Sequence, residues 1–130
     1  MAGTLTISTL SDGTNSTSST NCIQGSSKAW ACWNGSDGVA RASYNVSSIT
    51  RVAMGKFTVN FTNAFANTNY GFSGGVGYSV SDQSAWLGGP NAVNRTTWKT
   101  TTALQVYTFY QNGTVSNSDP TDISVFVYNT

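Results

Sequence analysis

The chain has 130 residues, of which only 8% are charged, and its formal net charge is +1. It contains no histidine and no glutamate, so it lacks the side chain that most often acts as a general base near neutral pH. This composition argues against an enzyme, and the dispersed lysines and arginines argue against nucleic-acid binding. No apolar run approaches the ~20 residues of a transmembrane helix, so we expect no membrane insertion.

Residues 1–27 differ from the rest of the chain. Leu5, Ile7 and Leu10 are followed by a stretch, 11–21, without a single apolar side chain. A segment this polar cannot build a core of its own. We therefore expect residues 1–27 to form an extended arm whose three apolar side chains dock on other proteins. Residues 28–130 are expected to form one folded domain.

From residue 28 onward the apolar side chains recur with a period of two, which is typical of strands. About eight short strands are predicted, and the pattern shows no helical period. They cover residues 28–33, 39–46, 47–53, 56–61, 70–80, 95–101, 103–110 and 123–128. The predicted fold is therefore all-β, an antiparallel sandwich or jelly-roll-like domain.

The alternation also predicts which side chains face the core. The strand at 56–61 has the cleanest pattern, with its three apolar side chains inward. Trp30 and Trp33 point to opposite sides of one strand, so one belongs to the core and the other faces a neighbour. Tyr44 and Val46 are expected to share a face. The complete inward set of the two best-patterned strands is Phe57, Val59, Phe61, Ile123, Val125 and Val127.

Turn signals separate these strands. Met54-Gly55 is expected at a hairpin turn, and Asn112-Gly113 is the strongest hairpin signal in the chain. Residues 81–94 are the longest stretch predicted to be irregular. Pro90 and Pro120 both fall in predicted loops, as proline does in sheet proteins.

The two cysteines, Cys22 and Cys32, are expected to be unpaired because the chain shows no export signal and matures in a reducing compartment. Two cysteines without histidine do not make an ordinary structural zinc site. We therefore predict no metal and no cofactor.

Five aspartates are the chain's only acidic side chains. Asp12 and Asp37 each precede glycine, and turn chemistry explains them. Asp119 and Asp122 flank Pro120 and offer a weak calcium site, since further oxygen ligands are not in view. Two carboxylates can hydrolyse glycosides in principle, but we expect no catalysis here.

Four separate pieces of the chain occur in an order that resembles a recurring domain of tailed-phage virion proteins. They are Lys-Ala-Trp at 28–30, Asn-Gly at 34–35, Arg-Ala-Ser-Tyr-Asn-Val-Ser-Ser-Ile at 41–49 and Phe-Thr-Val-Asn-Phe-Thr at 57–62. The resemblance covers about residues 1–72. It departs from the family at 31–33, where Ala-Cys-Trp stands in place of Val-Asn-Phe.

This resemblance implies a non-enzymatic structural protein of the virion, assembled in the host cytoplasm. Such domains are usually found in tail fibres or tail appendages that contact the host surface, and they are typically homotrimers. Other phage structural proteins would be the partners of the arm. A capsid decoration, or cement, protein that stabilises the phage head is the alternative, and a free carbohydrate-binding module is a third.

A contact site for a host-surface glycan is predicted near the Gly-Gly-Pro loop at 88–90. Aromatic faces stack on sugars, while amide and guanidinium groups bond to hydroxyls. The alternative is that one or both tryptophans belong to the core or to a subunit interface. The candidate contact residues are Tyr78, Trp86, Asn91, Arg95 and Trp98.

Overall fold

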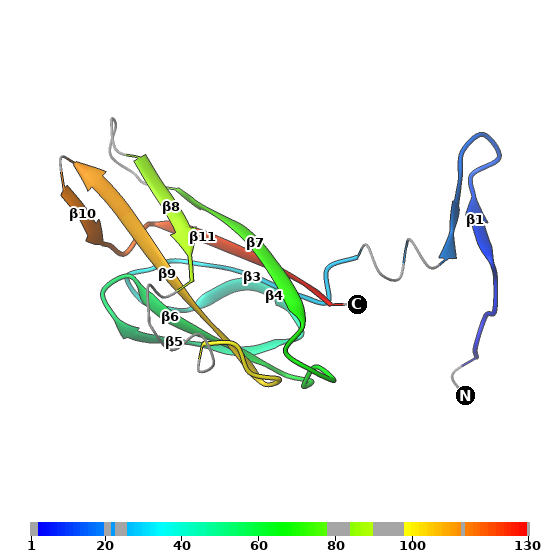
Figure 1. The fold of residues 1–130 in the computed structure, drawn as a ribbon, viewed down its shortest axis with the longest axis horizontal. Coiled ribbons are helices and arrows are strands. Elements are labelled where there is room, and N and C mark those ends of the chain that lie inside the picture. The colour runs from blue at the N-terminus through cyan, green and yellow to red at the C-terminus, as the bar shows by residue number, and fades with distance from the viewer. Residues whose placement is uncertain are drawn as a thin grey trace.

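The computed structural model describes residues 3–19, 22, 26–77, 84–89, 98–112 and 114–129. These residues form eleven strands. Two antiparallel sheets pack against each other, so the predicted all-β sandwich is confirmed (Figure 1).

The first sheet of the sandwich has four strands in the order β4-β3-β11-β7. All of its neighbouring strands are antiparallel. Its central strand β11 pairs along its whole length with β7, from Asp122 opposite Gly77 to Asn129 opposite Tyr70. The bounds are β3 Ala29–Trp33, β4 Ala40–Tyr44, β7 Tyr70–Gly77 and β11 Asp122–Asn129.

The second sheet has five strands in the order β10-β9-β6-β5, with β8 paired to β9. The long strand β9 pairs with β6 over its first half and with β10 and β8 over its second half. The predicted hairpin around Asn112 is confirmed by the β9–β10 pairing. The bounds are β5 Val46–Ala53, β6 Lys56–Phe61, β8 Ser84–Gly88, β9 Ala103–Asn112 and β10 Thr114–Asn117.

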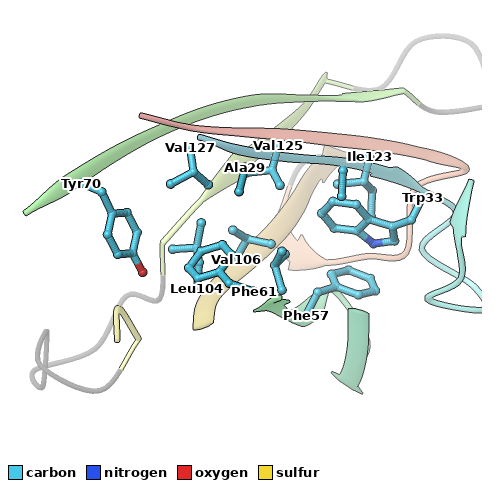
Figure 2. Packing of buried hydrophobic residues seen from close by; sticks show 12 residues of the cluster. Ala29, Trp33, Phe57, Phe61, Tyr70, Leu104, Val106, Ile123, Val125 and Val127 are labelled. Carbon is cyan, nitrogen blue, oxygen red and sulfur yellow. The ribbon is translucent and has the colours of Figure 1, made fainter. Parts of the chain in front are cut away.

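The core lies between the two sheets (Figure 2). Trp33 is fully buried and meets Phe57 edge-on, with ring centroids 5.7 Å apart. Trp30 lies on the other side of β3 and is only partly buried, as the alternation predicts. All six side chains predicted to point inward from β6 and β11 are buried. The buried apolar set is Ala29, Ala31, Trp33, Phe57, Val59, Phe61, Tyr70, Leu104, Val106, Ile123, Val125 and Val127.

The predicted strand at 39–46 is wrong at its end, because the chain changes sheets at Asn45. This residue has a φ of 52°, a left-handed conformation that asparagine tolerates better than most residues. Its side-chain Oδ1 accepts from the Asn63 N–H at 2.8 Å, which fixes the corner. Tyr44 therefore stays in the four-stranded sheet and is exposed, while Val46 begins β5 and packs against the core.

The stretch 81–94, predicted to be irregular, contains a strand. β8 pairs with β9 from Ser84 opposite Gln111 to Gly88 opposite Tyr107. The local sequence lacks clear alternation, and the strand exists because β9 offers a second edge to pair with. The region predicted as a strand at 95–101 contributes a single bridge, Lys99 to Leu104, within its described part.

The arm holds a small hairpin of its own, β1 Thr9–Ser11 and β2 Ser16–Ser18. Asp12 closes its turn, because Oδ1 accepts from the N–H groups of Thr14 at 2.9 Å and Asn15 at 2.7 Å. In the described part of the chain, this hairpin forms a separate two-stranded sheet. Figure 1 shows it apart from the sandwich.

Candidate functional site

The structure locates only part of the predicted glycan site. Tyr78, Asn91 and Arg95 lie outside the described residues. The backbone of Trp86 lies in β8 opposite Phe109, and its side chain is not among the described ones. The grouping of these four residues with Trp98 therefore stays a prediction.

Trp98 is half-buried and takes part in packing. Its ring meets Phe72 of β7 edge-on, with centroids 5.7 Å apart, and both rings lie against the core. A side chain at Gly89 would place its Cβ only 3.1 Å from the Trp98 ring, so glycine lets the backbone approach it closely. These contacts are those expected of a core-edge tryptophan.

Tyr70 anchors the turn that follows Trp98. Its buried hydroxyl donates to the carbonyl oxygens of Thr100 and Ala103, each at 3.0 Å. Burial raises the pKa of Tyr70 to about 12. The Lys99 Nζ lies 4.6 Å from the centre of the Tyr70 ring, in cation–π contact. This arrangement holds the turn and keeps the hydroxyl protonated at neutral pH.

The described carboxylates form hydrogen bonds and ion pairs within the fold. Asp37 caps its own turn by accepting from the Val39 N–H at 2.8 Å, as predicted. Asp119 accepts from Arg51, whose pKa is raised by that hydrogen bond, and Asp122 pairs with Arg41. Among the residues that the structure describes, no group of three or more His, Cys, Asp or Glu side chains lies together.

The arm presents an apolar surface. Leu5, Ile7 and Leu10 are all exposed on it. Together with Cys22 they line an open hollow of about 350 Å³. Exposed apolar side chains that gather on one segment make this arm a candidate contact surface. Cys22 is exposed, Cys32 is half-buried, and both are free thiols.

A second surface, which the sequence patterns did not predict, lies on the outer face of the four-stranded sheet. Tyr44, Trp30 and Phe126 lie directly opposite one another on β4, β3 and β11, and Tyr128 follows two residues later. The signal was present, because the alternation that points Val125 and Val127 inward must point Phe126 and Tyr128 outward. The alternation does not give the order of the strands, and it is this order that brings the four side chains together.

Searches against protein-family models, curated proteins and solved structures find no match to this chain. None of the described segments forms a helix of the length and apolarity needed to cross a membrane.

Proposed function

We propose that the protein is a non-enzymatic structural component of a tailed-phage virion, in an appendage that contacts the host surface. The arm docks on other virion proteins and the sandwich projects from them. The single observation that carries this proposal is the arm, in which Leu5 and Ile7 before the hairpin β1–β2 and Leu10 within it are all exposed. The order of sequence pieces shared with phage virion domains supports the same assignment.

An arm of this kind favours an assembly protein over a free carbohydrate-binding module. Leucine and isoleucine side chains in water are unfavourable, and each buried one contributes about 1.5–3 kcal/mol. A module that works alone gains nothing from exposing three of them on an arm. In an assembly protein these side chains are buried when the arm binds its partner, and their burial stabilises the complex.

A trimer is the assembly we propose for the mature protein. The sandwich carries exposed apolar side chains, among them Val39 before β4, Val52 on β5 and Met54 in the turn between β5 and β6. Closed symmetry would cover such side chains on every copy at once. Sedimentation of the purified chain should give three times the monomer mass, and a stable monomer at micromolar concentration would contradict the trimer.

The location of the chain in intact particles tests the function. Cryo-electron microscopy of the phage should place density of this sandwich on the tail, with the arm inserted into a neighbouring protein. Density on the head shell would instead support the alternative, a decoration protein that braces the capsid. Absence of the chain from purified particles would end both assignments.

A matched pair of variants tests the arm. Replacing Leu5, Ile7 and Leu10 together by Ser should remove the protein from particles, while the isolated chain still folds. The control replaces the neighbouring exposed arm residues Thr4, Thr6 and Thr9 by Ser, which leaves the three apolar side chains in place. Loss of the control from particles as well, or retention of the apolar variant, would contradict docking through these side chains.

A further inference from the structure

The outer face of the four-stranded sheet carries a row of aromatic rings. Tyr44, Trp30 and Phe126 occupy one register position on three adjacent strands. Neighbouring strands lie about 4.8 Å apart, so the three side chains rise side by side from the sheet. Tyr44 is 60% exposed and Phe126 and Tyr128 are each 39% exposed. Such rings offer flat apolar faces beside polar edges.

Beside the row the sheet is nearly bare of side chains. On β7, Gly71, Ser73, Gly75 and Gly77 lie opposite the outward residues of β11. The result is an open hollow of about 270 Å³ next to the rings. Its lining includes Cys32, Gly75, Gly77, Asp122 and Ser124. The face therefore combines a row of aromatic rings with an adjoining low floor that carries hydroxyl and carboxylate groups.

The charges beside the hollow are already neutralised. Arg41 of β4 reaches Asp122 of β11 in an ion pair, and its guanidinium also donates to the carbonyl oxygen of Thr121 at 3.0 Å. A neutral ligand rich in hydroxyl groups complements this face, because it can bond to both partners without a desolvated charge of its own. An anionic ligand would have to compete with Asp122 for Arg41.

We propose that this aromatic face, defined by Trp30, Tyr44, Phe126 and Tyr128 and the adjoining hollow, binds a neutral polysaccharide. Sugar rings stack on the aromatic side chains, and their hydroxyl groups bond to Asp122, Arg41 and Ser124. The inference rests on the proposed function, since it names the class of host-surface molecule that the appendage contacts.

The composition of the face favours a sugar over a second copy of the chain. Its outward residues on β3, β11 and β7 include no leucine, isoleucine or valine, whereas obligate interfaces between subunits resemble the hydrophobic core of a domain. Beside the rings the outward positions are small or carry hydroxyl groups, as at Gly75, Gly77 and Ser124. Sugar rings can occupy the space above these small residues, whereas a second protein surface would leave it unfilled.

Affinity electrophoresis of the full chain tests the proposal. The native gels contain dextran, mannan or galactan as neutral probes, and alginate as the anionic one. At least one neutral probe should retard the protein, and alginate should not. Tyr44→Ala should raise the dissociation constant at least about tenfold, because Tyr44 is the most exposed ring of the row and a few aromatic side chains carry most of the energy of such contacts. Tyr44→Phe keeps the ring and should bind nearly as the parent does.

A second variant blocks the hollow without removing a ring. A Cβ at Gly75 would meet only the Ser124 Oγ, at 3.7 Å, so Gly75→Val should fold normally. It should weaken polysaccharide binding as Tyr44→Ala does. Thr50→Ala is the control, because Thr50 is exposed but lies on β5 in the other sheet. It should leave binding unchanged, and melting curves of all variants confirm that they are folded.

Several outcomes would overturn the proposal. Retardation by none of the neutral probes would do so, as would equal binding by the parent and Tyr44→Ala. Dissociation of an oligomer by Tyr44→Ala would show that a second copy covers the face. The test is separate from that of the proposed function: a chain that binds dextran but is absent from particles would refute only the virion assignment.

Discussion

The backbone N–H of Gly55 donates a 2.8 Å hydrogen bond to Oδ1 of Asp119. This bond joins the turn between β5 and β6 to the segment that follows β10. On its other side, the Gly55 carbonyl oxygen accepts from the Thr108 N–H at 2.9 Å, and the Thr108 carbonyl oxygen accepts from Ser118. These hydrogen bonds hold the five-stranded sheet together at the point where β9 changes partner from β6 to β10.

Gly55→Ala should strongly destabilise the sandwich. Gly55 has a φ of 63°, and an added Cβ would lie 2.6 Å from backbone atoms of both Thr108 and Ser118. Left-handed strain and overpacking each cost roughly 1–3 kcal/mol, so we expect a loss of about 3 kcal/mol or more in the free energy of unfolding. Urea denaturation of the purified chain measures it.

Gly38→Ala is the matched control for that prediction. Gly38 has a similar φ of 68°, but its Cβ would meet Arg51 Cβ at a tolerable 3.4 Å. The cost should therefore be that of backbone strain alone, about 1–2 kcal/mol. Equal losses in the two variants would show that the close approach at Gly55 is unimportant.

Asp119→Ala should cost more than Asp119→Asn. The carboxylate accepts from the Gly55 N–H and from the Arg51 Nε at 3.1 Å, and it is largely buried. Alanine removes both contacts, for about 2 kcal/mol, whereas asparagine keeps an acceptor for Gly55 and should cost about 1 kcal/mol. The melting temperatures of the two variants show which of them is less stable. If asparagine is as damaging as alanine, the ion pair with Arg51 accounts for the contribution of Asp119 and the bond to Gly55 adds nothing.

Tyr70→Phe should lower the stability by about 1 kcal/mol, because two carbonyl oxygens lose the hydroxyl donor. The folded-state pKa of about 12 lies above the ordinary value of 10.0. The parent should therefore keep this contribution below pH 10 and lose it as the pH rises toward 12. Denaturation at pH 8 and 11 should show the gap between parent and variant narrowing, and a constant gap would contradict this.

The arm hairpin should fray in acid. Hydrogen bonds from the N–H groups of Asn15 and Thr14 lower the pKa of Asp12 below the ordinary 3.8. Their contribution is present above that value and is lost as the pH falls through the lower folded-state pKa. Amide chemical shifts of Thr14 and Asn15 should move toward those of a disordered chain below pH 3. Asp12→Asn should remove most of that pH dependence.

Deleting residues 2–24 should leave the melting temperature of the sandwich within a few degrees of the parent value. The described arm residues Leu5, Ile7 and Leu10 are exposed, and the buried apolar set begins at Ala29. The removed segment therefore contributes little burial to lose. Ser27 stays in the truncated chain because its Oγ donates to the Val127 carbonyl oxygen at 3.2 Å. A collapse of folding would mean that the arm completes the sandwich.

Local patterns were enough for much of the fold. The strand at 56–61 and its inward side chains are as predicted, because strict alternation of apolar and polar residues admits one register. The opposite placement of Trp30 and Trp33 follows from the same period of two. The hairpin at Asn112 was also predictable, since turn residues act over a few positions.

Only the tertiary structure decided which strands meet. β8 forms because β9 has a second edge to pair with, and the chain changes sheets at Asn45 because the Asn63 backbone holds that corner. Tyr44 and Phe126 are far apart in the sequence, and strand order brings them to either side of Trp30. The sequence by itself determined which side chains of each strand point to the core, because alternation is a local pattern. The aromatic face required long-range pairing, which no local pattern encodes.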